Sequence, residues 1–365
     1  MTSTNPAPKP ERNYGIDLLR LLSMFFVVLL HALLLGGLLD HDAAISPHKA
    51  QAAWLLEILA YGAVDTFALI SGYVGFRAEK RPFKFKPIFS LWSQAVFYGL
   101  ATFVFCSLFR PRLVEAGDLF THLLPVSHGY YWYLTAYIGL LFLTPLLNAA
   151  VRDLSERQCH TAIFAALGLF SVFAIFSGDK FVTSGGYSIW WLAVLYFIGA
   201  ALKKSNLLTK INKRWCLFGI FACALLTWTL KIFGSEFVLF DFKFGPDFLV
   251  SYLSPTIVIS AILYLRLFSS LKLRPSFIKL IKWFAPCAFA VYLLNCNPHI
   301  QRFYPAKFLG SLTSASTPVT ILTVLGFSLG FFVVALLVEK LRQTAVAFLN
   351  HQLPKPKPKT LPKTP

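Results

Sequence analysis

The sequence predicts an all-α polytopic integral membrane protein with about ten transmembrane helices. Of its 365 residues, 56% are hydrophobic and only 14% are charged, whereas about a quarter of the residues of a soluble domain are charged. The mean hydropathy is +0.63, so too little polar surface remains to cover a soluble globule. Apolar stretches of about 17 to 25 residues, long enough to cross a bilayer, recur along the chain.

Each predicted span is an apolar run that ends at a charged or turn-rich break. In chain order the spans are Asp17–Leu39, Trp54–Phe76, Ile88–Phe109, Tyr130–Ala150, Thr161–Ser177, Tyr187–Leu202, Trp215–Ile232, Phe248–Leu267, Trp283–Tyr304 and Pro318–Leu341. The breaks between them contain DHD, RAEKR, RPR, RDLSER, SGDK, KKSN, GSE, LKLRPS and PAK. Because no connection is long enough for a soluble domain, residues 17–343 are predicted to form one membrane domain.

The two ends of the chain are predicted to lie outside the membrane. Residues 1–16 begin with a polar, proline-containing segment and form a short N-terminal tail. Residues 344–365 end in QLPKPKPKTLPKTP. Alternating Pro and Lys cannot form a helix, so this end is predicted to be a disordered tail.

The basic residues are divided unequally between the two predicted sides. The two tails and the even-numbered loops hold 25 Lys and Arg, against eight in the odd-numbered loops, with Arg20 inside the first span. Cytoplasmic loops are enriched in Lys and Arg, so both termini are predicted to be cytoplasmic. The net charge of +18 then reflects topology and attraction to anionic lipid headgroups, and no nucleic-acid partner is expected. Neither cysteines nor histidines show metal-ligand spacing, so no metal site is predicted.

Three ionisable residues lie in the first span, although each costs a few kcal/mol in a lipid-facing helix. Asp17 and Arg20 are three residues apart and can pair on one helix face. Arg20 and His31 project within about 20° of each other and are about 16 Å apart along the axis. An inner arginine suits a phosphate-bearing ligand, and a deeper neutral imidazole suits a general base. Alternatively, Arg20 extends to the interface and His31 is a hydrogen-bonded packing residue.

Further polar and aromatic residues mark the second and fourth spans. Asp65 lies near the midplane, where it either orients His31 or pairs with another helix. Glu57 lies nearer the outer surface, where it either contacts an acceptor or is simply interfacial. Trp132 belongs to an aromatic run beside His128, which is either an interfacial belt or a sugar-stacking surface.

Several of these residues resemble the motifs of the membrane-bound acyltransferase-3 family. Its hallmark is an arginine followed, after ten intervening residues, by a histidine in the first helix; Arg20 and His31 match this spacing. Asp17 matches the acidic residue commonly found three before the arginine. Further matches are Phe67, Ser71, Gly72, Tyr73, Trp132, Tyr137, Pro145, Asn148, Tyr292 and Leu293. The sequence departs from the family at Asn295, where a histidine is frequent, and at Lys84 and Lys86, where many members have two arginines.

The resemblance implies a multi-pass O-acetyltransferase of the bacterial inner (cytoplasmic) membrane. Members move an acyl group, most often acetyl from cytosolic acetyl-CoA, to hydroxyls of envelope polysaccharides, lipopolysaccharides, peptidoglycan or lipid-linked glycans. Acyl-CoA would be a co-substrate, and no permanently bound cofactor is expected.

The resemblance also suggests roles for individual residues. Arg20, with Lys84 and Lys86, would bind the CoA phosphates. His31 would deprotonate the attacking hydroxyl, or alternatively carry the acyl group. The residues expected to contact the acceptor are Trp132, Tyr73 and Glu57.

Two other classes of membrane protein remain as alternatives. A glycan or lipid exporter would also keep intramembrane charges, but would typically show inverted repeats or broken helices in matching halves, which the sequence does not show. A glycan polymerase or ligase would carry a large, arginine-containing outer loop, whereas the predicted outer loops are short.

Overall fold

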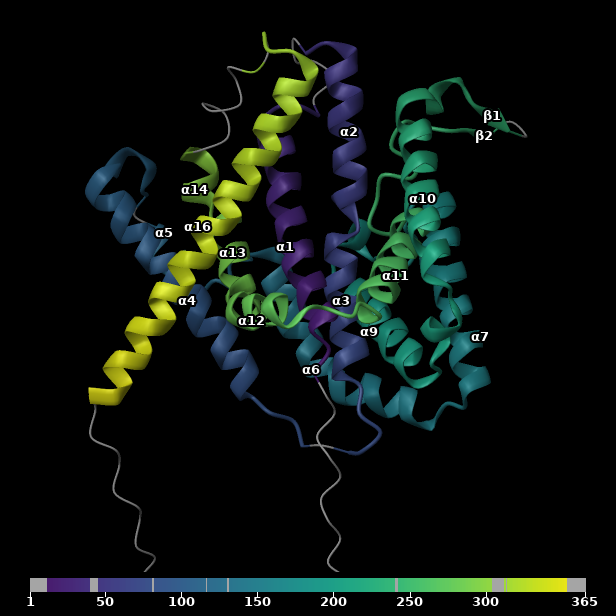
Figure 1. Cartoon of the computed structure of the whole chain (residues 1–365), viewed down its shortest axis with the longest axis horizontal. Helices are drawn as coiled ribbons and strands as arrows, with labels where there is room; N and C mark the ends of the chain where they lie inside the picture. The colour runs from purple at the N-terminus through teal and green to yellow at the C-terminus, as the bar shows by residue number, and fades with distance from the viewer. Residues whose placement is uncertain are drawn as a thin grey trace, which may run out of the picture.

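The computed structural model describes residues 12–39, 45–80, 82–115, 117–129, 131–239, 242–303, 312 and 314–352, which form a predominantly helical bundle (Figure 1). The first half contains α1 (Tyr14–Leu35), α2 (Pro47–Tyr61), α3 (Ala63–Gly75), α4 (Lys86–Phe109), η1 (Pro111–Leu113), α5 (Asp118–Leu123), α6 (Trp132–Asp153), α7 (Glu156–Leu167), η2 (Gly168–Phe173) and α8 (Ala174–Ser177). The second half contains η3 (Ser184–Gly186), α9 (Ile189–Lys204), η4 (Leu207–Lys210), α10 (Lys213–Phe233), η5 (Gly234–Glu236), α11 (Pro255–Ser269), α12 (Pro275–Phe284), η6 (Ala285–Cys287), α13 (Ala288–Asn295), α14 (Pro298–Phe303) and α16 (Thr317–Gln352). Two-residue strands β1 (Val238–Leu239) and β2 (Phe242–Lys243) pair antiparallel. The predicted all-α class is confirmed.

The described residues contain eight helical segments that are long and apolar enough to cross a membrane. The segments are α1, α2 with α3, α4, α6, α7 through α8, α10 with η5, α12 through α13, and α16. The chain is thus a multi-pass membrane protein, but the predicted count of about ten spans is not confirmed. α9 and α11 contain only 16 and 15 residues, or about 24 Å of helix against a hydrocarbon core of about 30 Å.

The structure also differs from the predicted boundaries of several elements. The second predicted span is two helices that meet at Gly62, and the ninth is interrupted by η6. α1 begins at Tyr14, within the predicted N-terminal tail. α16 continues to Gln352, past the predicted end of the membrane domain at 343, because no proline or glycine interrupts the chain between that position and Pro354. Residues 1–11 and 353–365 of the predicted tails lie outside the described residues.

In the core of the bundle, α9 packs so closely against α3 that the backbones of the two helices are in contact. A Cβ at Gly72 would lie 1.9 Å from the Tyr196 carbonyl oxygen, and one at Gly199 would lie 2.2 Å from the Leu69 carbonyl oxygen. Small residues at such crossings let membrane helices approach closely. Gly72 therefore fixes the distance between the helix that carries Asp65 and its neighbour α9.

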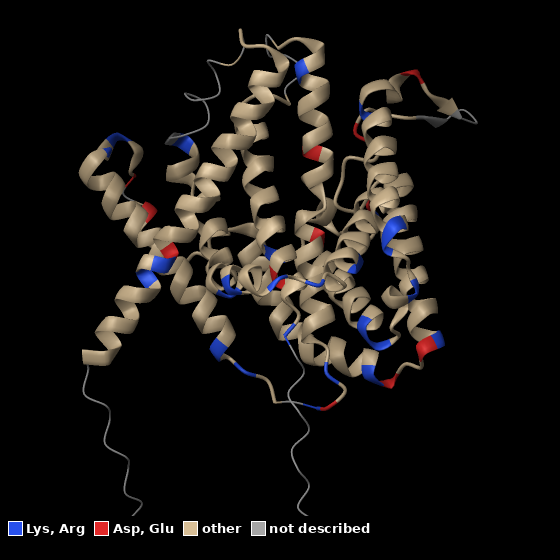
Figure 2. Cartoon of the chain, in the orientation of Figure 1, with Lys and Arg blue, Asp and Glu red and all other residues tan. Residues whose placement is uncertain are grey.

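The start of α1 and the end of α16 lie at the same end of the bundle (Figure 1). Figure 2 shows Lys and Arg gathered toward that end, including the connection between α3 and α4. α1 runs from this end into the bundle interior and carries Arg20 before His31.

Candidate active site

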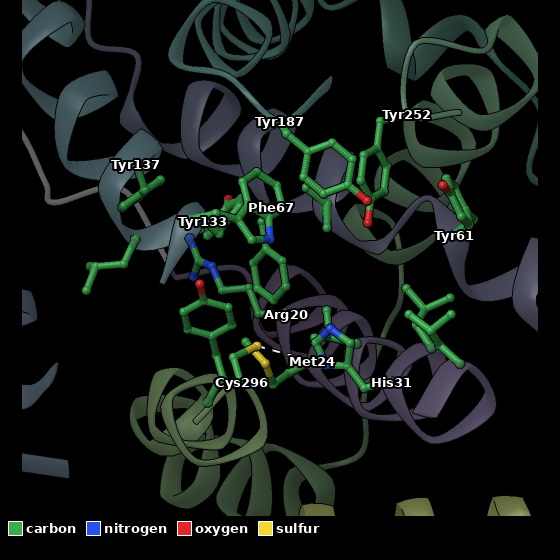
Figure 3. Close-up of a pocket in the computed structure, with 18 of the residues that line it drawn as sticks. Arg20, Met24, His31, Tyr61, Phe67, Tyr133, Tyr137, Tyr187, Tyr252 and Cys296 are labelled. Atoms are coloured by element: carbon green, nitrogen blue, oxygen red, sulfur yellow. Dashed lines mark hydrogen bonds between the residues drawn. The ribbon is translucent and has the colours of Figure 1, made fainter. Parts of the chain in front are cut away.

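A central cavity of about 680 Å³ is lined by residues of α1, α2, α3, α6 and α13, among other segments (Figure 3). Arg20 and His31 both line it, as their shared helix face predicts. Glu57 and Trp132 also line it. The fold therefore brings together predicted site residues from α1, α2 and α6.

Arg20 is held in place by the acidic residue predicted to pair with it. Asp17 is buried and accepts hydrogen bonds from Arg20 Nη1 at 2.7 Å and from Arg12 Nε at 2.6 Å. Asn13 caps the same helix end by accepting from the backbone N–H of Gly15 at 3.0 Å. The remaining guanidinium nitrogens of Arg20 donate to no described residue, so they are available to an anionic ligand.

Asn295 sets the protonation pattern of the His31 imidazole. Its Oδ1 lies 2.5 Å from His31 Nδ1, and its side chain is fully buried at the end of α13. An amide oxygen only accepts hydrogen bonds, so Nδ1 of the neutral ring carries the proton and Nε2 keeps its lone pair. That tautomer is the one a general base requires.

Cys296 is the second neighbour of the imidazole. Its Sγ lies 3.9 Å from His31 Nδ1 and lines the central cavity. Because Nδ1 donates its proton to Asn295, it has no lone pair with which to deprotonate the thiol. The geometry does not make a cysteine–histidine nucleophile pair.

Asp65 contacts α9, and among the described residues it forms no hydrogen bond with His31. It is fully buried, does not line the central cavity, and accepts a hydrogen bond from Trp191 Nε1 at 3.0 Å. Of the two interpretations of Asp65, its placement matches pairing with another helix. Sequence reasoning missed Asn295 as the partner of His31, since it registered this position only as a departure from the family pattern.

Aromatic side chains form much of the cavity wall. The ring centroids of Trp132 and Tyr187 are 4.6 Å apart, and those of Tyr187 and Tyr252 are 5.1 Å apart. Tyr133 and Tyr137 are stacked with an interplanar angle of 15°. The Tyr133 hydroxyl is buried without a hydrogen-bond partner among the described residues. Aromatic rings can stack on the apolar face of a ligand, and a hydroxyl without a partner can hydrogen-bond to a polar group at the edge of the same ligand.

Charged groups lie at the far end of the cavity from Arg20. Glu57 is only 7% exposed, and its Oε2 atom has no hydrogen-bond partner in the described part of the chain. Lys231 Nζ pairs with Asp247 Oδ1 at 2.5 Å and lies 3.8 Å from the centroid of the Trp54 ring. A buried carboxylate with a free oxygen is costly, and a hydroxyl donor from a ligand would relieve that cost.

The remaining predicted site residues lie outside the central cavity. Lys84 lines a second cavity of about 440 Å³, together with Arg77, Lys80 and Arg152; we call it the basic cavity. Lys86 is the first residue of α4 and lines neither cavity. Tyr73 also lines neither, and its ring packs against Lys203 at 5.0 Å.

The basic cavity follows the central cavity along the same three helices. On α3 the lining residues step from Ser71 to Gly75, and on α6 from Tyr137 to Leu141. On α4 they step from Leu91 back to Ile88. Steps of three or four residues equal one helical turn, or about 5 to 6 Å, so the two cavities adjoin at the end nearer the start of α1.

The fold and the cavity define a multi-pass membrane protein whose central cavity is lined by an arginine and a hydrogen-bonded histidine of α1. The acyltransferase domain model of the acyltransferase 3 family matches residues 13–339. The chain therefore belongs to the acyltransferase 3 family, as its sequence motifs suggest, and it is a membrane acyltransferase. No curated protein and no solved structure shows a significant match to it.

Proposed function

We propose that the protein is an O-acyltransferase of the bacterial inner membrane. It moves an acyl group, most simply acetyl, from cytosolic acyl-CoA to a hydroxyl of a cell-envelope glycan or lipid-linked saccharide. The observation that carries this proposal is the His31–Asn295 hydrogen bond, which leaves Nε2 as a base inside the cavity that Arg20 also lines. The excess of basic residues at the end where α1 starts supports a cytoplasmic location for that end.

The acyl donor binds from the cytoplasmic end in this proposal. Arg20 and Lys84 contact the phosphates of CoA, and Arg77, Lys80 and Arg152 add positive charge around Lys84. Arg152 Nε is buried without a hydrogen-bond partner among the described residues, so it is available to an anion. The pantetheine arm passes the single helical turn between the cavities and brings the thioester toward His31. Lys86 lies at the edge of this arrangement and attracts the donor only through its charge.

The acceptor enters from the opposite end. Its sugar ring stacks on Trp132, and one of its hydroxyls donates to Glu57. A second hydroxyl faces His31 Nε2, which removes its proton as the oxygen attacks the thioester carbonyl carbon. The new C–O ester bond forms, the C–S bond breaks, and the imidazolium returns its proton to the leaving CoA thiolate. Because donor and acceptor share one cavity, this direct transfer needs no acyl-histidine intermediate.

Replacing the proposed base tests the function. His31→Ala should lower transfer of radiolabelled acetyl from acetyl-CoA to envelope glycans by at least about a hundredfold, the typical contribution of a general base. The matched control is His128→Ala, which removes an exposed histidine outside the cavity. Near-normal transfer by a membrane-inserted His31→Ala protein would overturn the assignment. A wild-type protein that moved glycan without acylating it would favour the exporter alternative.

A further inference from the structure

α12 is a short helix with three chemically distinct surfaces. Ile281 is buried and faces the bundle, with Ile278 half-buried beside it. The large apolar side chains of Phe277, Leu280 and Trp283 are 56%, 51% and 44% exposed. Lys279 and Lys282 are both exposed and, at about 100° per residue, project within about 60° of each other. A helix with adjoining exposed apolar and basic surfaces is typical of a membrane interface.

The position of α12 in the bundle agrees with that location. Figure 1 shows α12 lying crosswise to α1 and α16, near the level at which α1 begins. Lys282 Nζ lies 4.9 Å from the ring of Tyr14, the first residue of α1, and Lys340 Nζ lies 5.1 Å from the ring of Trp283. Aromatic rings and lysines gather in this way where a membrane protein meets the headgroups.

The charges around α12 indicate what covers it. Neither Lys279 nor Lys282 forms an ion pair with a described acidic residue. Lys272 and Arg274 precede the helix and add to its positive charge. The C-terminal segment of the chain is itself rich in lysine, so its charge does not complement this surface. A phosphate-bearing anionic lipid complements both the lysines and the exposed apolar side chains.

We propose that α12 is a docking helix for anionic phospholipids. Lys279 and Lys282 contact the headgroup phosphates. Phe277, Leu280 and Trp283 enter the upper acyl-chain region. This proposal rests on the membrane fold and goes beyond acyl transfer.

Lipid docking at α12 also bears on the central cavity. The chain passes directly from α12 into η6, where Ala285 and Pro286 line the cavity. Lys340 and Gln343 of α16 donate to the carbonyl oxygens of Trp283 and Pro286. A lipid that holds α12 in place therefore also helps to hold η6, whose residues Ala285 and Pro286 line the cavity.

Native mass spectrometry of the purified full-length protein in detergent tests the proposal. Phosphatidylglycerol and phosphatidylcholine with identical acyl chains are titrated separately. K279Q/K282Q should bind phosphatidylglycerol about tenfold more weakly than wild type, because two headgroup contacts are lost. The matched control is R157Q/K210Q, which removes two exposed basic residues elsewhere at the same predicted membrane surface; it should bind like wild type.

Three results would overturn the proposal. They are unchanged phosphatidylglycerol affinity of K279Q/K282Q, an equal loss in R157Q/K210Q, and equal weakening toward phosphatidylcholine. Lipid binding is measured without acyl transfer, so its failure would leave the proposed enzymatic function untouched.

Discussion

In the proposed mechanism, the Asn295 amide is the side chain that prepares His31 to act as a base. Asn295→Ala removes the acceptor for Nδ1, so the proton is no longer confined to that nitrogen and the ring orientation is no longer fixed. We expect acetyl transfer to fall about tenfold or more. Asn295→His supplies an imidazole nitrogen that can accept from Nδ1, and it should retain most of the activity.

Cys296→Ala is the matched control, because it removes the other neighbour of Nδ1 without removing an acceptor. Transfer rates of the three variants in proteoliposomes check this prediction. Loss of transfer in Cys296→Ala with retention in Asn295→Ala would reverse the roles assigned to these neighbours.

A buried histidine pair outside the membrane-spanning segments makes stability depend on pH. The Nε2 atoms of His122 on α5 and His299 on α14 are 3.1 Å apart, and Asp118 Oδ2 lies 3.6 Å from His299 Nε2. Burial, reinforced by His299 and opposed by Asp118, lowers the pKa of His122 to about 4. An unfolded histidine titrates near 6.5.

Between about pH 6.5 and 4 the unfolded chain therefore binds more protons than the folded chain, so stability is lost as the pH falls through this window. The Tm should be lower at pH 5 than at pH 7.5, and His122→Gln should flatten the difference. Thermal unfolding in detergent, with His128→Gln as an exposed control, measures both. An unaltered pH dependence in His122→Gln would contradict the prediction.

The crossing of α3 and α9 depends on the absence of a side chain at Gly72. Gly72→Ala places a Cβ 1.9 Å from the Tyr196 carbonyl oxygen, so the two helices must separate. We expect a loss of about 1 to 3 kcal/mol, as for other overpacked cores, seen as a lower Tm in detergent.

Gly168→Ala is the matched control, because nothing lies within 4 Å of a Cβ at that helical position. Equal stability of the two variants would show that the helices adjust without cost.

The sequence predicts where helices occur better than where they bend or how long they are. Every predicted span overlaps a helix, because an apolar run must satisfy its backbone hydrogen bonds internally in lipid. Hydropathy does not register the break at Gly62 or η6, since apolar residues continue on both sides of each break. α11 begins at Pro255, after the start predicted at Phe248, because the intervening residues form turns whose composition is also apolar.

The candidate site was predictable where it depends on one helix. The shared face of Arg20 and His31 follows from helical periodicity, and their common cavity agrees with it. The partner of His31 depends instead on how α1 and α13 cross, which a single sequence does not encode in any local pattern. Similar depth in the membrane left two interpretations of Asp65 open, and its hydrogen bond from Trp191 of α9 matches the one in which it pairs with another helix.

At the scale of the whole molecule, the proposed function has donor and acceptor approach the central cavity from opposite ends. Lys84→Gln combined with Arg152→Gln removes two cations from the basic cavity and should weaken CoA binding about tenfold, as expected for lost charge-assisted contacts. Glu57→Gln removes a buried carboxylate at the far end of the central cavity. It should leave CoA affinity unchanged and lower acetylation of envelope glycans.

Equilibrium binding of CoA to the purified protein and ester-bound acetate on glycans from cells separate these effects. The lysine–arginine variant should show weaker CoA binding and less ester-bound acetate, because donor binding precedes transfer. Glu57→Gln should show only less ester-bound acetate. Weaker CoA binding by Glu57→Gln would place both substrates at one end. Unchanged CoA binding by the lysine–arginine variant would show that the basic cavity does not bind the donor and that Arg20 is its remaining phosphate contact. The proposed arrangement, with His31 between a cytosolic thioester and an acceptor from the opposite side, requires that the lysine–arginine variant lose CoA binding and that Glu57→Gln retain it.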